Sequence, residues 1–123
     1  MLYGDSITYG WSATGFSVVN RPPFSPPYTD MVFDRLEKVY GAKIVRKNLS
    51  VSGKDTGWAI GDDNIAAVVA EAPDLLVLAF GMNDGVHREP GEFGRNIDHI
   101  VRAVSKGCPD VEIAVVLPML PNS

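Results

Sequence analysis

The chain has 123 residues, a length that fits a single domain with its own hydrophobic core. Apolar residues make up 46% of the sequence, but no apolar run approaches the roughly 20 residues that a membrane helix needs. The net charge of -4 argues against nucleic acid as the main partner, because phosphate binding needs clustered Lys and Arg. The sequence shows no secretory leader, and it leaves the cellular compartment undecided.

The first ten residues end in a turn that displays a serine. Gly4-Asp5-Ser6 follows a short apolar lead-in, which is typical of a buried strand that turns sharply, although it is also ordinary turn chemistry. The Ser-, Gly- and Pro-rich segment 14–27 cannot form regular structure, so we expect a surface loop beside Ser6. Three aromatic residues in or near this segment either line the rim of a binding site or pack on one another: Trp11, Phe16 and Phe24.

Helices and strands then alternate along the chain. We predict helices over residues 27–40, 62–71 and 90–106, and strands over residues 42–49, 75–80 and 113–117, with loops at 50–61 and 81–87. The first helix has an apolar stripe that is expected to face inward, made of Tyr28, Val32, Leu36, Val39 and Tyr40. Asp62 or Asp63 is expected to cap the second helix. The last two strands are apolar throughout, as a parallel strand covered on both faces requires.

This alternation, with its short links, predicts a single α/β domain over residues 1–123. The expected fold is a three-layer α/β/α arrangement, in which a doubly wound parallel sheet has helices on both faces. Ligands of such sheets gather at the carboxyl ends of the strands. Three loops of unusual composition leave strand ends here, and they contain Ser6, Gly53 and Asn83.

These three loops contain the groups that an acyl transfer needs. Ser6 is a candidate nucleophile, although an alcohol is a poor nucleophile until a base takes its proton. The backbone amides of Gly53 and Ser6 and the side chain of Asn83 are candidate donors to the oxyanion that such a reaction forms. Taken singly, Gly53 and Asn83-Asp84-Gly85 are also common turn residues. Their appearance at successive strand ends favours the catalytic interpretation.

The same segments resemble the conserved blocks of the SGNH hydrolases, also called the GDSL esterases and lipases. Residues 4–8 match the first block, residues 48–56 the second, and residues 81–84 the third, in the family's order and over essentially the whole chain. The resemblance implies that Ser6 is the nucleophile and that Gly53 and Asn83 complete the oxyanion hole. It implies a flavodoxin-like fold and hydrolysis of carboxylic esters, with short acyl or acetyl groups, through an acyl-serine intermediate. Asp5 is expected to order the turn rather than to contact substrate.

One block of the family has no counterpart in this sequence. The family's catalytic base and its carboxylate come from a C-terminal Asp-x-x-His, and we expect the chain to be an incomplete domain that stops before it. Without its base, Ser6 should be nearly inert, because disrupted triads keep only about 10³–10⁴-fold over water. His87, at the end of Asp84-Gly85-Val86-His87, is a weak candidate base. His99 is expected to face solvent.

No cofactor is expected, and no metal site, because the two histidines and the scattered carboxylates form no ligand motif. The single cysteine, Cys108, is expected to be a half-buried structural thiol. The expected partner is a small ester, although the sequence does not select among acetylated sugars, lipids, thioesters and aryl esters. The alternative function is a non-catalytic ligand-binding or assembly module on the same fold. It would associate with itself through apolar surface that the missing C-terminal part leaves exposed.

Overall fold

A parallel sheet forms the centre of the molecule. The computed structural model describes residues 1–11, 13–16 and 20–118. Strands β1 (Leu2–Gly4), β2 (Leu75–Ala79) and β3 (Glu112–Val115) lie in the order β1-β2-β3, and both pairs are parallel. The predicted parallel α/β fold is confirmed, and the two predicted apolar strands at residues 75–80 and 113–117 are present with slightly different bounds.

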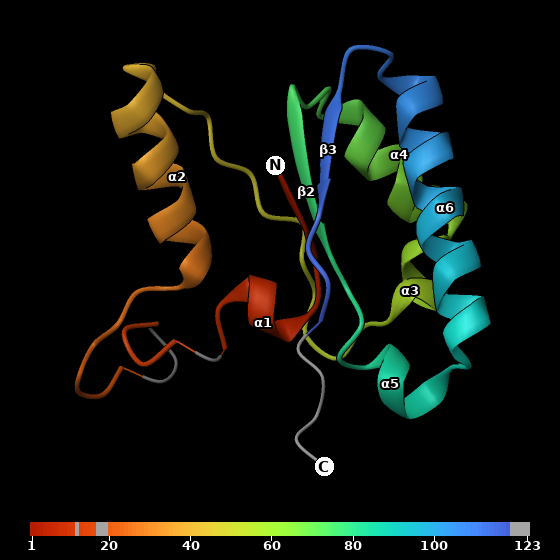
Figure 1. Ribbon diagram of the computed structural model, residues 1–123, viewed down its shortest axis with the longest axis horizontal. Helices are drawn as coiled ribbons and strands as arrows, with labels where there is room; N and C mark the ends of the chain where they lie inside the picture. Colours follow the sequence, from red (N-terminus) through yellow and green to blue (C-terminus); the bar gives the residue numbers. More distant parts are fainter. Residues whose placement is uncertain (12, 17–19, 119–123) are drawn as a thin grey trace.

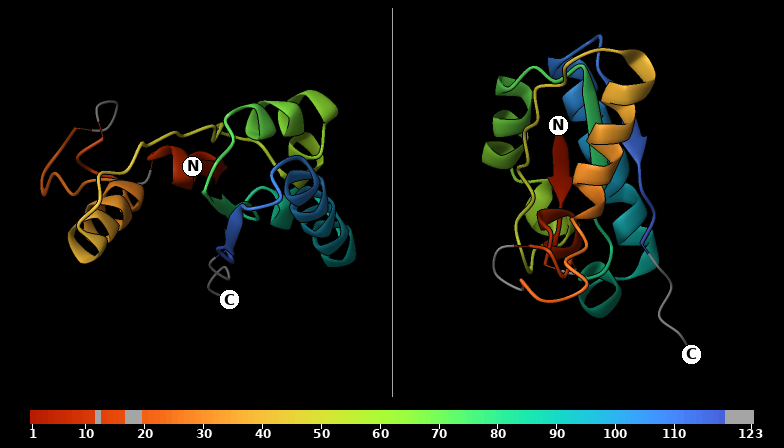
Figure 2. Two further views of the ribbon diagram at one scale, coloured as in Figure 1. Left: turned by 90° about the horizontal axis from the view of Figure 1, so that it is seen from above. Right: turned by 90° about the vertical axis from the view of Figure 1, so that its left-hand side faces the viewer.

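Helices cover both faces of this sheet (Figures 1 and 2). One face carries α2 (Tyr28–Tyr40), and the opposite face carries α4 (Asp62–Ala70) and α6 (Pro90–Gly107). Three helices of four residues lie near the carboxyl ends of the strands: α1 (Ser6–Tyr9), α3 (Thr56–Ala59) and α5 (Asp84–His87). The segment 50–61, expected to be a loop, thus contains a helical turn at α3.

Alternate residues of the strands feed two cores. The larger core lies on the side of α4 and α6, where Leu76, Leu78 and Phe80 meet Val68 and Ile100. The smaller core lies under α2 and contains Leu2, Phe33 and Val77. Cys108 is half-buried between these elements as expected, and its thiol contacts the Val69 carbonyl oxygen at 3.6 Å.

The strand predicted over residues 42–49 is wrong. This segment is irregular, and its one ladder contact is a parallel bridge between Asn48 and Leu2. Val45, which was expected at the strand's centre, is 80% exposed. The segment crosses from α2 to the edge of β1 and pairs only at its end, so its apolar residues do not form a buried strand.

The predicted inward face of α2 is correct only in part. Leu36 packs against the smaller core and Tyr28 bonds to Thr8, but Tyr40 is 75% exposed, and Val32 and Val39 are exposed as well. The buried residues of the helix are Thr29 and Phe33. Phe33 packs under the helix against Leu2 and Val77, and this contact selects the face. The predicted cap of α4 differs too, because Gly61 takes the cap position and Asp62 is the first helical residue.

The last strand was expected to be buried, and this prediction is wrong. β3 lies at the edge of the sheet, and most of its residues are exposed. The exposed apolar run continues beyond it through Val116 and Leu117. The apolar sequence therefore predicted a strand here correctly, but it did not predict that the strand lies at the edge of the sheet.

The buried Tyr3 hydroxyl gives a direct test of the larger core. It donates a hydrogen bond to the Ala59 carbonyl oxygen at 2.8 Å, and its ring packs edge-on against Phe80. Tyr3→Phe leaves that carbonyl without its donor, so we expect the free energy of unfolding to fall by about 1–3 kcal/mol. Urea unfolding measures this, with the exposed Tyr40→Phe as the matched control. Equal stabilities of the two variants would contradict the assignment.

Candidate active site

Ser6 is the first residue of α1, directly after β1. Asp5 caps this helix, and its carboxylate accepts a hydrogen bond from the Ile7 amide at 3.0 Å. Gly10 ends the helix in the left-handed conformation that favours glycine. Gly4 is also required, because a Cβ at this position would overlap the Ala79 carbonyl oxygen of β2. The sequence therefore forces a sharp strand-to-helix turn that leaves Ser6 half-buried at the sheet edge.

Asp5 connects this turn to the third loop. Burial raises the pKa of the Asp5 carboxyl, while hydrogen bonds from the backbone amides of Ile7 and Met82 oppose that rise. These two amides belong to the residue after Ser6 and the residue before Asn83. The Asp5 carboxylate thus joins the first loop to the third through these hydrogen bonds, as expected of a residue that orders the turn.

The second loop lies against the first through two hydrogen bonds. The Val51 amide donates to the Gly4 carbonyl oxygen at 3.0 Å, and the Asn48 side chain donates to the Thr8 carbonyl oxygen at 3.0 Å. Gly53 has φ +75°, a conformation that L side chains rarely adopt, and a Cβ there would meet open space. Glycine is therefore needed at this position for its backbone conformation and not for close packing.

The third loop is joined to the second by Asn83. Its side-chain nitrogen Nδ2 donates to the Lys54 carbonyl oxygen at 2.8 Å, next to Gly53. A primary amide carries two N–H groups, so this bond uses one and fixes the plane of the other. The structure thus brings the loops of Ser6, Gly53 and Asn83 together at one sheet edge.

Behind this edge lies a buried polar cluster that the sequence analysis missed. The Asp84 carboxylate accepts from the Thr56 amide at 3.0 and 3.2 Å and from the Thr56 hydroxyl. Asn96 of α6 donates to the same hydroxyl at 3.0 Å, and all three residues are buried. One signal was available in the sequence. Asn96 falls on the face of α6 that carries Ile100 and Val104, and a polar residue in an apolar stripe indicates a buried partner.

Arg88 closes the outer side of this cluster. It contacts Asp55 at 3.0 Å, lies 3.8 Å from Asp84, and also pairs with Glu92. Burial acts to raise the pKa of the Asp55 carboxyl, but the hydrogen bonds from the Trp58 amide and from Arg88 hold it below its ordinary value.

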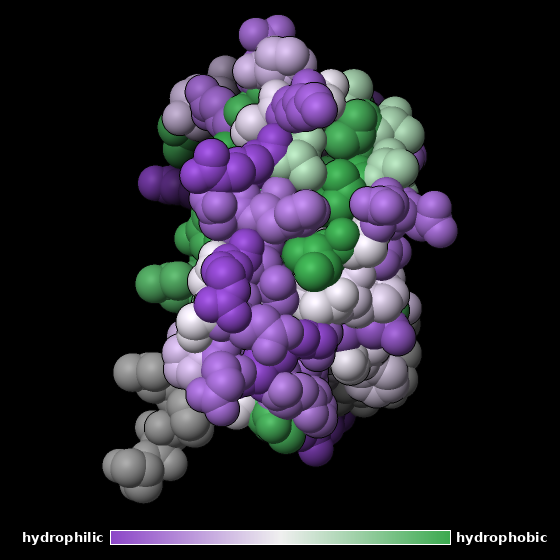
Figure 3. All heavy atoms as spheres, turned by 90° about the vertical axis from the view of Figure 1, so that its right-hand side faces the viewer, coloured by the Kyte–Doolittle hydropathy of each residue, from purple (hydrophilic) through white to green (hydrophobic). Residues whose placement is uncertain are grey.

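Neither histidine is placed as a partner of Ser6. His87 is the last residue of α5 and is exposed. His99 is exposed on α6, as expected. The side of the molecule on which α6 lies is mainly hydrophilic (Figure 3). Within the described residues, the Ser6 hydroxyl has no hydrogen bond to a histidine. The role of His87 as a weak candidate base stays a prediction.

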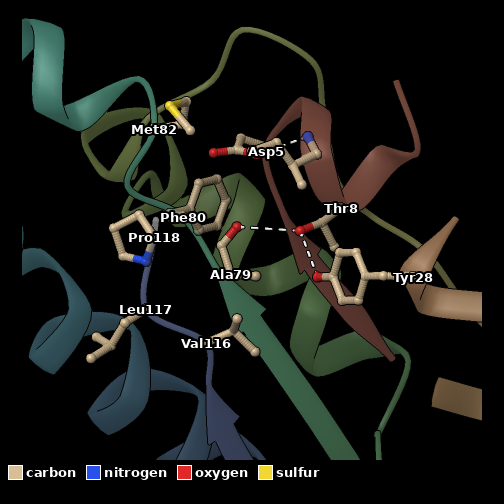
Figure 4. A pocket seen from close by; sticks show the side chains of 10 residues that line it. Asp5, Thr8, Tyr28, Ala79, Phe80, Met82, Val116, Leu117 and Pro118 are labelled. Carbon is tan, nitrogen blue, oxygen red and sulfur yellow. Dashed lines mark hydrogen bonds between the residues drawn. The ribbon is translucent and has the colours of Figure 1, made fainter. Parts of the chain in front are cut away.

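A cavity of about 360 Å³ opens beside the Ser6 turn (Figure 4). Its lining is mostly apolar and includes Ile7 and Met82, the sequence neighbours of Ser6 and Asn83. Across the cavity lie Val116 and Leu117, which follow β3. On the side of α2, the Thr8 hydroxyl bonds to the Tyr28 hydroxyl at 2.9 Å and to the Ala79 carbonyl oxygen.

The aromatic residues of the segment 14–27 do not line this cavity. Phe16 stacks edge-on with Tyr9 at a centroid distance of 5.5 Å and lies 6.5 Å from Trp11. Phe24 is exposed. Phe16 therefore packs on aromatic residues that precede the loop rather than on the loop's own Phe24. Residues 17–19 of the predicted loop lie outside the described residues.

Two further properties concern ligands and membranes. Among the described residues, no three His, Cys, Asp or Glu side chains are grouped so as to hold a metal ion. No helix in the described ranges combines the length and the apolar character that crossing a bilayer requires.

The sheet, its two helical layers and the three loops at its carboxyl edge place the chain among proteins with the SGNH hydrolase fold. The chain belongs to the GDSL-like lipase/acylhydrolase family, whose model matches residues 2–123. No curated protein matches the sequence.

Three solved structures illustrate the shared fold. The chain aligns with TesA at a TM-score of 0.65 and 17% identity, covering 98% of this chain and 61% of TesA. It aligns with the psychrotrophic esterase EstA from Pseudoalteromonas sp. at a TM-score of 0.59 and 17% identity, covering 95% of this chain and 61% of EstA. It aligns with a carbohydrate esterase of family 3 from Talaromyces cellulolyticus at a TM-score of 0.60 and 21% identity, covering 94% of this chain and 59% of the esterase. The chain thus spans about three fifths of the length of these proteins.

Proposed function

We propose that this domain hydrolyses carboxylic esters with short acyl groups through an acyl-serine intermediate on Ser6. One observation carries the proposal: the Asn83 side chain bonds to the carbonyl oxygen of Lys54, beside Gly53, at the sheet edge where the Ser6 turn emerges. This arrangement gathers a hydroxyl nucleophile, a glycine amide and a side-chain amide. Family membership supports the same reaction class.

In this mechanism the Ser6 hydroxyl oxygen attacks the ester carbonyl carbon while a base takes its proton. The carbonyl π electrons move onto oxygen, and the negative charge is stabilised by the amides of Ser6 and Gly53 and by the second N–H of Asn83. Collapse of this intermediate breaks the bond to the alcohol, which leaves with the proton held by the base. Water then attacks the acyl-serine in the same way, releasing the carboxylic acid and restoring Ser6.

The base belongs to the proposal as well. Both histidines of this chain are exposed, and neither bonds to Ser6 within the described residues. We therefore assign the base to a histidine and carboxylate supplied from outside residues 1–118, with His87 as the competing candidate. In both cases the Ser6 turn and the oxyanion donors belong to the present chain.

The apolar cavity beside Ser6 suits the acyl part of the substrate. Ile7 and Met82, the sequence neighbours of Ser6 and Asn83, present carbon surface to this cavity, although Ser6, Gly53 and Asn83 are not among its lining residues. An acyl chain of a few carbons transferred from water into such a lining gains about 0.8 kcal/mol per buried methylene. A small apolar acyl group is therefore the substrate part that this site favours.

A second candidate function is an assembly module without catalysis. The observation that favours it is the exposed apolar run from Val115 to Leu117 at the open edge of the sheet. An exposed edge strand of this kind can pair with another chain. A lack of reaction at Ser6, together with sedimentation as a dimer, would favour this function over hydrolysis.

Covalent labelling separates these functions and locates the base. A phosphonate ester with a good leaving group is expected to label Ser6, detected by the intact mass and by peptide mapping. Without an in-chain base, labelling should be slow and should accelerate with added imidazole, which replaces the missing proton acceptor. The matched comparison is a longer version of the chain that contains an Asp-x-x-His block, which should react rapidly without imidazole.

Two outcomes would change the proposal. Fast labelling of the 123-residue chain that disappears in His87→Ala, but not in the control His99→Ala, would assign the base to His87. If neither the short nor the longer version labels at Ser6, the proposed hydrolase mechanism is contradicted.

A further inference from the structure

Thr56 is the centre of the buried polar cluster behind the proposed active site. It is the first residue of α3 and is 0% exposed. Its hydroxyl donates to the Asp84 carboxylate and accepts from Asn96, while its amide donates to the same carboxylate at 3.0 Å. The single hydroxyl proton and one lone pair are both in use, so this side chain has a fixed orientation.

This cluster contains a carboxylate that the fold has removed from water. Asp84 is 2% exposed, and a buried carboxylate is tolerated only where donors and a countercharge surround it. Thr56 supplies two donors, and the Arg88 guanidinium lies 3.8 Å away. Losing the Thr56 hydroxyl would leave the carboxylate short of one donor, so the segments around it would have to move to find another.

Those segments are the two that carry the proposed oxyanion donors. Lys54 and Thr56 lie one and three residues after Gly53, and Asp84 directly follows Asn83. Two connections join them: Asn83 to the Lys54 carbonyl at 2.8 Å, and Asp84 to Thr56. The Asp55–Arg88 ion pair, at 3.0 Å, is a third connection on the outer side.

The third connection also explains a glycine. A Cβ at Gly57 would overlap the Arg88 guanidinium, so glycine leaves the space in which Arg88 reaches Asp55 and Asp84. The second and third loops are therefore joined by the Asn83–Lys54 bond and, next to it, by the Asp84–Thr56 bonds and the Asp55–Arg88 ion pair.

We propose that Thr56 is a positioning residue, which fixes the second N–H of Asn83 toward the oxyanion through Asp84, with Asn96 orienting the Thr56 hydroxyl. The proposal rests on the proposed function of Asn83 as an oxyanion donor. Thr56 does not touch the substrate. It sets the distance between Gly53 and Asn83, and displacements of about 1 Å at such a site are enough to cost about 10²-fold in rate.

The test compares Thr56→Val, which keeps the shape and removes the hydroxyl, with Thr56→Ser, which keeps the hydroxyl. Thr29→Val is the matched control, because Thr29 is also buried but lies on α2. The first readout is the pair of side-chain amide proton signals of Asn83 in ¹⁵N-labelled protein, assigned with Asn83→Ala. The second is the rate of Ser6 phosphonylation, measured in the longer version of the chain.

We expect Thr56→Val to shift both Asn83 signals and to slow phosphonylation by about 10- to 100-fold. Thr56→Ser should restore both properties, and Thr29→Val should change neither. A folded Thr56→Val variant with unchanged Asn83 signals and an unchanged rate would overturn the proposal.

Two arrangements keep this test decisive. If Thr56→Val does not fold, Asn96→Leu removes only the bond that orients the Thr56 hydroxyl, and unchanged Asn83 signals in that variant would overturn the proposal. If the unsubstituted protein never labels at Ser6, the proposed function fails. The Asn83 signals would still decide the positioning role.

Discussion

Replacing Ser6 by alanine is expected to lower ester hydrolysis by an amount that depends on whether the base is present. In a version of the protein that contains the Asp-x-x-His block, Ser6→Ala should reduce kcat by about 10⁶-fold, the effect of removing a serine nucleophile from a complete triad. In the 123-residue chain the same substitution should change little. Members of a catalytic triad act as a unit, and the loss of one already removes most of the effect of the others.

The structure makes this a clean substitution. Asp5 caps α1 through its own carboxylate, and the Ser6 side chain takes no part in that bond. Alanine is also a good helix former, so the turn should keep its shape. Hydrolysis of a chromogenic short-chain ester measures the effect, with Ser105→Ala, an exposed serine on α6, as the control. A large loss of activity in the short chain would mean that it contains a working base.

The parts of the fold that the sequence predicted are those in which local pattern and tertiary environment agree. The 3.6-residue apolar period of α6 and the wholly apolar β2 needed no knowledge of neighbours. The edge position of β3 could not be predicted without knowledge of its neighbours, because the sequence 113–117 is as apolar as β2. Only the strand order shows that no strand lies beyond β3 among the described residues.

The inward face of α2 was predicted only in part, for a related reason. The contact of Phe33 with Leu2 and Val77 turns the helix so that Leu36 faces the sheet, while Val32 and Val39 are exposed. The segment 42–49 contains β-favouring residues, but a strand also needs a partner along its length. Here the segment bridges to β1 at a single position, between Asn48 and Leu2.

The candidate site divides in the same way. The sequence could predict that the loops of Ser6, Gly53 and Asn83 lie near one another, because the loops after parallel strands meet at the carboxyl edge of the sheet whatever their sequence. The bonds that hold those loops in register join residues about 30 to 40 positions apart, such as Asn83 to Lys54 and Asn96 to Thr56. No local pattern encodes such pairs. Asn96 alone left a trace, as a polar residue on an apolar helix face.

Asn83 provides the sharpest test of the oxyanion hole. Asn83→Ala removes the second N–H, which would donate to the developing negative charge, and one such donor is worth about 10²–10³-fold in kcat. The donor acts mainly on the charged intermediate, so KM should change little while kcat falls. Steady-state kinetics on a short-chain ester, in the version of the protein that carries the base, measure both constants.

The matched control for Asn83 is Asn64, whose side chain also donates to a backbone carbonyl, that of Trp58, at 2.7 Å. Asn64→Ala removes a similar amide-to-carbonyl bond at the start of α4 without touching the site. The two variants should lose comparable stability, about 1 kcal/mol each, because each loses one neutral hydrogen bond. Only Asn83→Ala should lose activity. An equal fall in kcat for both variants would reduce Asn83 to a structural role, and a rise in KM alone would place it in substrate binding. A selective loss of kcat at Asn83 is what an oxyanion donor requires, because Asn64→Ala matches the loss of the bond to Lys54, and only the loss of the second N–H of Asn83 then acts on the transition state.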